Sequence, residues 1–176
     1  MDLLLLAGNS IHNKEWIHTV KKILSPLFKK SLVHEYAHWQ NGELDIDLEA
    51  ELKSLDLELK SSDSYYIFAK SVGSILTLKG MDSGQLKPLK VVIAGLPLGL
   101  IKESVVFFNK WLENNKVPLL IIQNTNDPLG SFLEVKKYLQ ELNLGFEYEI
   151  IEVPGDDHSY NDLVKLKELV SNFIRK

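Results

Sequence analysis

Six short strand-like segments, separated by segments with helical spacing, constrain the fold of this chain most strongly. The strand-like segments are mostly continuous apolar runs, at residues 3–7, 31–39, 65–69, 90–94, 117–123 and 146–153. Apolar residues recur with helical spacing over residues 13–24, 45–60, about 72–78, 104–113, 129–142 and 161–174. Apolar strands that alternate with helices are typical of a parallel sheet covered on both faces. The sequence therefore predicts an α/β fold: a three-layer α/β/α sandwich with a mostly parallel, six-stranded sheet.

Composition narrows the class of partner. The 176 residues suit a single domain over 1–176, and 20 basic against 24 acidic residues give a net charge of −4. The only arginine is Arg175, which argues against nucleic acid as a partner. The chain has no cysteine, so disulfides, thiolate catalysis and cysteine-ligated zinc are excluded, and a reducing, cytoplasmic location is expected. No apolar stretch approaches the roughly 18 residues of a membrane span, and no signal peptide is predicted.

The carboxyl ends of the predicted strands are where ligands bind in a sheet of this type. The third strand ends in Ala69-Lys70-Ser71-Val72-Gly73, an A-x-S-x-G variant of the G-x-S-x-G nucleophile elbow. Small residues at both ends of this motif let a tight strand-to-helix turn form without clashes. The turn would hold Ser71 at a helix N-terminus, where free N–H groups favour negative charge. The alternative is an ordinary turn with a helix-capping serine.

Two further polar residues follow the last two predicted strands. Asp127 comes after the fifth strand and precedes Pro128, and His158 lies in the loop before the last helix. Taken singly, each has a simpler interpretation, as a turn former or as an exposed loop histidine. Together with Ser71 they follow the serine, acid, histidine order of α/β-hydrolases. The sequence therefore predicts a catalytic triad of Ser71, Asp127 and His158.

On these residues the chain resembles the α/β-hydrolase superfamily over nearly its whole length. More narrowly, it is similar to the small lidless serine hydrolases of the dienelactone-hydrolase and retinoblastoma-binding types. The resemblance implies that the first strand here corresponds to the family's third. It also implies that 6–9 matches the family's His-Gly-x loop, so that the N–H groups of Asn9 and Val72 form an oxyanion hole. Ala7 and Ala69 depart from the family's usual His and Gly, whereas Gly155-x-x-His158 matches its histidine loop.

The resemblance implies a carboxylesterase-like serine hydrolase that uses an acyl-enzyme, takes a small-molecule substrate and needs no cofactor. Only about ten residues, 95–104, join the fourth strand to its helix, which leaves no room for a cap domain. Asp156 and Asp157 beside His158 should repel anions, so a small neutral ester is expected. The apolar segment 96–101 either borders the site or only packs the loop. The candidate substrate-lining residues are Ser10, His12, Leu96, Pro97, Leu98 and Leu129.

A second motif points to different chemistry. His34-Glu35-Tyr36-Ala37-His38 is a literal H-E-x-x-H, the zinc metalloprotease signature, which needs a helix to place both histidines on one face. Here the segment lies in the predicted second strand, where that geometry fails. The only candidates for a third ligand are Asp47 and Glu49. We therefore predict no metal site, and interpret the segment as an edge strand with solvated His and Glu side chains.

Two other interpretations remain open at this stage. One is a catalytically idle α/β-hydrolase fold that serves as a binding module, which the substitution at Ala7 favours. The other is a nucleotide-binding α/β domain, although the chain contains neither G-x-G-x-x-G nor G-x-x-x-x-G-K-[ST]. His18 is expected on the surface of the first helix. The sequence gives no information on the oligomeric state.

Overall fold

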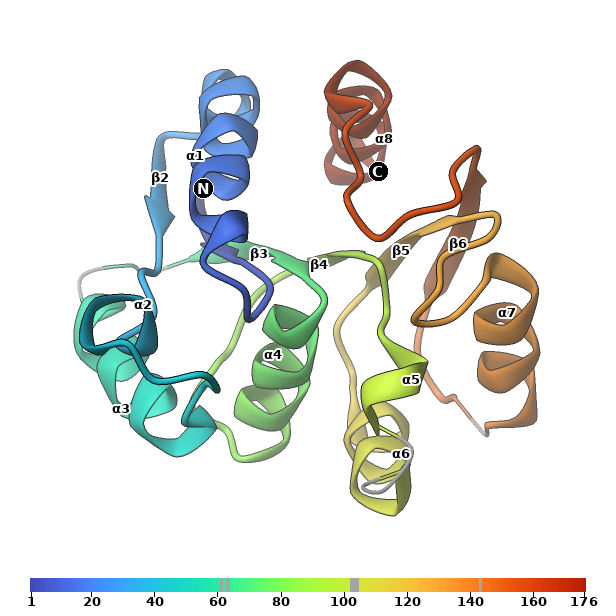
Figure 1. Ribbon diagram of the computed structural model, residues 1–176, viewed down its shortest axis with the longest axis horizontal. Helices are drawn as coiled ribbons and strands as arrows, with labels where there is room; N and C mark the ends of the chain where they lie inside the picture. The colour runs from blue at the N-terminus through green and yellow to red at the C-terminus, as the bar shows by residue number, and fades with distance from the viewer. Residues whose placement is uncertain (61, 63, 102–104, 143) are drawn as a thin grey trace.

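The sheet is parallel throughout. The computed structural model of the chain describes residues 1–60, 62, 64–101, 105–142 and 144–176, with no side-chain description for 105 and 106. All neighbouring strands pair in parallel, in the order β2-β1-β3-β4-β5-β6, which confirms the predicted fold class (Figure 1). The strands are β1 (Asp2–Leu6), β2 (Lys30–Val33), β3 (Tyr65–Lys70), β4 (Val91–Ala94), β5 (Leu119–Asn124) and β6 (Tyr148–Val153).

Helices cover both faces of this sheet, as predicted. On one face lie α1 (His12–Leu24) and α8 (Leu163–Arg175), which contact each other. On the opposite face lie α3 (Leu48–Glu58), α4 (Val72–Asp82), α6 (Val105–Asn114) and α7 (Phe132–Glu141) (Figure 1). Strict alternation of six strands with six helices is wrong, because the described residues also form three short elements. These are the 3₁₀ turn η1 (Ser25–Leu27), α2 (His38–Asn41) and α5 (Leu98–Ile101), which are too short to leave a periodic pattern.

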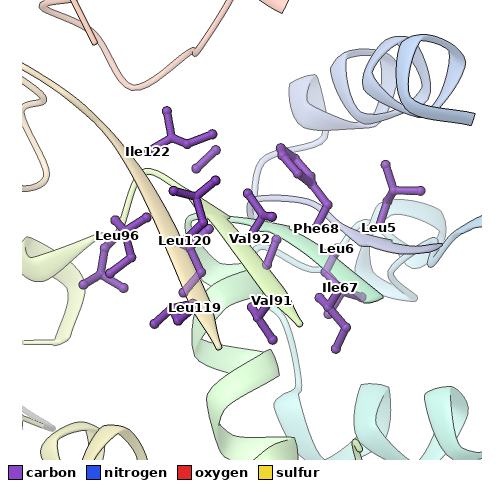
Figure 2. Packing of buried hydrophobic residues seen from close by; sticks show 14 of the residues in the cluster. Leu5, Leu6, Ile67, Phe68, Val91, Val92, Leu96, Leu119, Leu120 and Ile122 are labelled. Atoms are coloured by element: carbon purple, nitrogen blue, oxygen red, sulfur yellow. The ribbon is translucent and has the colours of Figure 1, made fainter. Parts of the chain in front are cut away.

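The hydrophobic core fills both faces of the sheet (Figure 2). Successive side chains of a strand point to opposite faces, so Leu5 and Phe68 lie on the α1 side while Leu6 and Ile67 point the other way. All four are completely buried. The Phe68 ring packs against Trp16 of α1, with 6.2 Å between ring centroids. Burial on both faces explains why these strands are continuously apolar.

The direction of the chain reverses between β1 and β3. From β1 the chain moves outward to the edge strand β2, and then returns to β3 before continuing to β4, β5 and β6. Adjacent parallel strands that continue in opposite directions leave a crevice at their carboxyl ends, where ligands bind. The segments at this point are the loop after Leu6 and the turn at Ser71.

The second strand is shorter than predicted. It ends at Val33, residues 34–37 lie outside any helix or strand, and His38 begins α2. The helix α1 begins at His12, one residue before the segment 13–24 over which the sequence predicts it. The predicted helix start at residue 104 and part of the 95–104 connection lie outside the described residues. Within the described ranges, no helix has the length and apolar character that a membrane crossing requires.

Candidate active site

Ser71 occupies a strained turn between β3 and α4. Its backbone has φ 52° and ψ −121°, a combination that residues other than glycine rarely adopt. The Ser71 N–H donates to the carbonyl of Ala94 at the end of β4, 3.3 Å away. The side chain makes no capping hydrogen bond to α4, which contradicts the interpretation as a helix-capping serine. Residues with rare backbone angles, such as Ser71 at the end of a central strand, often occur at functional sites.

On the helix side of the turn, the residue at position 73 must be a glycine because the backbone of β1 and its loop lies directly against it. A Cβ at this position would lie 2.6 Å from the carbonyl oxygen of Leu6 and 2.7 Å from that of Ala7. These are fixed backbone atoms, so a larger residue would push the start of α4 away from the end of β1. On the strand side, Ala69 is fully buried and pairs in register with Leu6 and Ile93. Small residues at both positions therefore bring Ser71 close to the β1 loop.

His158 and Asp127, which lie 31 residues apart in the sequence, are in direct contact. The His158 Nδ1–H donates to Asp127 Oδ2 over 2.7 Å, and the Leu129 N–H donates to Asp127 Oδ1 over 2.9 Å. The Asp127 side chain is fully buried, whereas 17% of the His158 side chain is exposed. The other ring nitrogen, His158 Nε2, is buried and has no hydrogen-bond partner among the described residues.

Gly95 lies between His158 and the Ser71 turn in the structure, because it contacts the imidazole and is next to a residue that binds the turn. It follows Ala94, whose carbonyl accepts the Ser71 N–H, and its φ of +71° is in the left-handed region. A Cβ on Gly95 would lie 2.8 Å from His158 Cε1. The imidazole therefore packs directly on the backbone next to the Ser71 turn. No hydrogen bond joins Ser71 Oγ to His158 Nε2 in the described structure, as is common before substrate binds.

Tyr160 belongs to the same cluster, although it is not among the site residues that the sequence predicts. Its hydroxyl donates to Asp127 Oδ2 over 2.7 Å and accepts from the Asn124 N–H over 3.1 Å. Burial raises the pKa of the Tyr160 hydroxyl, and Asp127 adds to this rise while the Asn124 N–H opposes it. No motif marks the residue. Its only signal in the sequence is its position two residues after the predicted histidine.

Asp157, the acid next to His158 in the sequence, is bound elsewhere. Its Oδ1 accepts the Ser159 N–H over 2.8 Å, and its carbonyl accepts from Asn124 Nδ2 over 2.9 Å. It thus holds the turn between β6 and α8. Asp156, also beside the histidine, is exposed. Among these acids, the hydrogen bonds bring Asp127 to the imidazole.

The loop after β1 is held by hydrogen bonds to its carbonyl groups. The Tyr36 hydroxyl donates to Ala7 O over 2.8 Å. His38 Nε2–H and Trp39 Nε1–H both donate to Asn9 O, over 2.7 Å and 2.8 Å. The Asn9 side chain is fixed as well, because its Oδ1 accepts the Ile46 N–H over 3.0 Å. The peptide between Gly8 and Asn9 is therefore held from both sides.

The backbone N–H groups of Asn9 and Val72 are the donors that the resemblance assigns to an oxyanion hole. In the described structure, neither N–H donates to a protein acceptor. Val72 is the first residue of α4, where the helix leaves N–H groups unpaired. Both groups are thus available to bind an oxygen atom of a ligand.

The H-E-x-x-H segment does not have the expected solvated side chains. His34 is 1% exposed and uses both ring nitrogens, with Nε2 2.7 Å from Glu51 Oε2 and Nδ1 2.9 Å from Glu58 Oε1. Burial lowers the pKa of His34, but hydrogen bonds and charge attraction from Glu51 and Glu58 outweigh it, so the pKa is raised. His38 is also buried. The expectation of solvated side chains is wrong because other segments replace the lost water: α3 supplies two carboxylates to His34, and the Asn9 carbonyl accepts from His38.

The remaining acids near this segment have other partners. Glu35 pairs with Lys14 and His18, whose hydrogen bonds lower the Glu35 pKa. Asp47 caps α3, and Glu49 pairs with Lys79. Among the described residues, no three His, Cys, Asp or Glu side chains form a cluster that could hold a metal ion. The structure therefore places the H-E-x-x-H segment as a support for the β1 loop.

Lys70, next to the predicted nucleophile, is buried, with only 5% of the residue exposed. Its Nζ donates to Asn13 Oδ1 over 2.6 Å and lies 5.2 Å from the centre of the Trp16 ring. Burial lowers the pKa of Lys70 to about 8, while the charges of Asp127 and Asp157 oppose this shift. The Lys70 ammonium group therefore lies near the candidate site and partly balances the negative charges of Asp127 and Asp157.

The candidate substrate-lining residues are not equally accessible. Ser10 and His12 are exposed, and Leu98 and Leu129 are half-buried, whereas Leu96 and Pro97 are buried. Leu96 packs in the hydrophobic core (Figure 2). A cavity of about 260 Å³ lies between the end of β6 and α8, beside Tyr160, and its lining includes neither Ser71 nor His158.

Solved structures with the same fold cover almost the whole chain. An α/β serine hydrolase homologue from Coxiella burnetii is 19% identical, with a TM-score of 0.75 over 99% of this chain and 85% of the other. An esterase from Pyrococcus furiosus is 16% identical, with a TM-score of 0.77 over 99% and 82%. A lidless α/β serine hydrolase from Xanthomonas campestris is also 16% identical, with a TM-score of 0.73 over 99% and 80%.

At the level of sequence, neither a protein-family model nor a curated protein matches the chain. The similarity to solved structures is therefore the basis for assigning the fold, and at 16–19% identity it supports the fold alone. The parallel sheet, its covering helices and the turn at Ser71 agree with it. The chain therefore has the fold of the α/β-hydrolase superfamily.

Proposed function

We propose that the chain is a serine hydrolase that cleaves a small, neutral ester or related acyl substrate. One observation carries the proposal: His158 is bound to Asp127 through Nδ1, its Nε2 is buried and unpartnered among the described residues, and its ring packs on Gly95, next to the Ser71 turn. Proteins of the same fold support it, since they include an esterase from Pyrococcus furiosus and a monoacylglycerol lipase from Paleococcus ferrophilus. The acids Asp156 and Asp157 beside the site favour a neutral substrate.

In the proposed first step, Ser71 Oγ attacks the carbonyl carbon of the substrate, and His158 Nε2 takes the hydroxyl proton. Asp127 holds the imidazole with its proton on Nδ1 and stabilises the imidazolium without itself taking a proton. The N–H groups of Asn9 and Val72 stabilise the oxyanion of the tetrahedral intermediate. His158 then gives its proton to the leaving alcohol, and the acyl group remains on Ser71.

In the second step, a water molecule releases the acyl group. His158 Nε2 takes a proton from the water as it attacks the acyl carbon, and returns it to Ser71 Oγ when the acid leaves. No cofactor takes part in either step. The two oxyanion donors serve again, because the second tetrahedral intermediate has the same charge. Loss of one such donor in comparable enzymes costs on the order of 100- to 1000-fold in rate.

The experiment combines a fluorophosphonate probe with hydrolysis of p-nitrophenyl acetate. We expect the wild type to be labelled and active, and Ser71→Ala to lose both signals while staying folded. The control is Ser83→Ala at the exposed end of α4, which should behave as the wild type. Labelling that persists in folded Ser71→Ala would refute the assignment of Ser71 as the nucleophile. A wild type without either signal would favour the binding-module alternative, which Ala7 at the usual histidine position supports.

A further inference from the structure

Three hydrogen bonds form one continuous buried chain behind the imidazole. The Asn124 N–H donates to the Tyr160 oxygen over 3.1 Å, and the Tyr160 hydroxyl donates to Asp127 Oδ2 over 2.7 Å. The same Oδ2 accepts the His158 Nδ1–H over 2.7 Å. Tyr160 and His158 therefore both donate to one carboxylate oxygen. The second oxygen of Asp127 is occupied by the Leu129 N–H.

The backbone is bent to bring Tyr160 to this position. Tyr160 has a φ of +57°, which is rare for a bulky aromatic residue and strains the backbone. Its ring meets the His158 ring edge to face, with 5.9 Å between centroids. A Cβ on Gly95 would lie 2.6 Å from Tyr160 Cε2, so a glycine there is needed to admit the ring. The strained backbone, the contact between the rings and the glycine at position 95 together place the Tyr160 hydroxyl beside Asp127.

The direction of donation from Tyr160 is fixed by its surroundings. Burial and the Asp127 charge raise the pKa of its hydroxyl, so the group keeps its proton. Since the Asn124 N–H already donates to the hydroxyl oxygen, the hydroxyl proton is directed to Asp127. A donor on Oδ2 spreads the carboxylate charge, which weakens the attraction between Asp127 and a protonated imidazole.

We infer that Tyr160 is a positioning residue, which holds the Asp127 carboxylate against His158 and, as a second donor to Oδ2, weakens the attraction of that carboxylate for a protonated imidazole. The inference rests on the proposed function, since it assigns His158 the role of general base. Other charged groups face this cluster: Asp157 from the β6–α8 loop and Lys70 from β3 both interact electrostatically with it, and Asp156 lies nearby. Replacement of the Tyr160 hydroxyl leaves all three in place.

The test compares Tyr160→Phe with Tyr148→Phe, a half-buried tyrosine of β6 outside this cluster. The titration of the His158 ring is followed by NMR, and the pH profile of kcat/KM is measured with p-nitrophenyl acetate. We expect Tyr160→Phe to raise the pKa of His158 by roughly half a unit to one unit, because a hydrogen bond to a charged group is lost. The acidic limb of the profile should move by the same amount. Tyr148→Phe should change neither.

An unchanged His158 titration in folded Tyr160→Phe would overturn the inference. If that variant does not fold, the wild type is prepared with 3-fluorotyrosine, whose more acidic hydroxyl donates more strongly. The His158 pKa should then fall, and an unchanged value would again overturn the inference. The NMR measurement requires no turnover, so failure of the Tyr160 inference can be distinguished from failure of the proposed hydrolase function. A shifted titration in a protein that the fluorophosphonate probe does not label supports the hydrogen-bond role and refutes the proposed hydrolase.

Discussion

His38 Nε2–H donates a 2.7 Å hydrogen bond to the carbonyl oxygen of Asn9, which links the H-E-x-x-H segment to the loop after β1. Trp39 donates to the same oxygen, and Tyr36 donates to the carbonyl of Ala7. The peptide N–H of Asn9, which the proposed mechanism uses as an oxyanion donor, lies between these two anchored carbonyls. A segment with a metalloprotease-like pattern thus holds the backbone of a different kind of site.

Trp39→Phe should lower kcat about tenfold with little change in KM. The variant removes one of the two donors to the Asn9 carbonyl, and a displaced oxyanion donor affects the transition state more than the bound substrate. Its stability cost should be about 1 kcal/mol, the typical value for one hydrogen bond. The control is Trp111→Phe in α6, which contacts Lys79 and Phe108 away from this loop. Equal kcat values for both variants would contradict the supporting role of Trp39.

His34→Gln should destabilise the protein more at pH 6 than at pH 9. The folded-state pKa of His34 is raised by Glu51 and Glu58, which outweigh the opposite effect of burial. Its contribution to stability is therefore complete below about pH 6.5, the unfolded value, and is lost as the pH rises through the folded pKa. Removal of one partner from a buried ion pair costs about 3 kcal/mol.

Urea unfolding at the two pH values measures this difference. His18→Gln serves as the control, since His18 pairs with Glu35 at the protein surface and should matter little at either pH. A destabilisation by His34→Gln that is independent of pH would show that the His34 imidazole is not positively charged in the folded state.

Gly73→Ala should destabilise the fold by about 1–3 kcal/mol and reduce activity further than that loss explains. The added Cβ would lie 2.6 Å from Leu6 O and 2.7 Å from Ala7 O, so either α4 or the β1 loop must move. Such a movement separates the two proposed oxyanion donors. Gly145→Ala is the matched control, because its nearest neighbour, Lys116 Nζ, is 4.0 Å from the added atom. Thermal unfolding and kcat are compared for both variants.

Asp127→Asn should lower kcat by about 100-fold or more while leaving the protein folded, because an amide favours the wrong imidazole tautomer. Asp156→Asn and Asp157→Asn should change kcat by less than about tenfold, since neither binds the ring. The three variants are compared on one ester, with circular dichroism as the test of folding. Near-normal turnover in Asp127→Asn, together with loss of activity in either neighbour, would require a different acid.

The sheet could be predicted because its signal is local. Residues 3–7 and 119–123, which lie within two of the predicted strands, are buried in the structure, and burial on both faces is the condition that makes a strand continuously apolar. The end of β2 could not be predicted in the same way. Residues 34–39 contain polar and aromatic side chains whose conformation depends on Glu51, Glu58 and the Asn9 carbonyl, all distant in the sequence.

Local signals in the sequence were enough to predict the parallel sheet and to place Ser71, Asp127 and His158 after the carboxyl ends of its strands, because apolar runs and small residues at turns are local properties. Which residues support these three depends on how distant segments pack together. Tyr160 and Lys70 carry no motif, and their roles depend on a carboxylate and an amide from other segments. A buried polar side chain must find a partner wherever the fold supplies one, and spacing along the chain does not encode that partner.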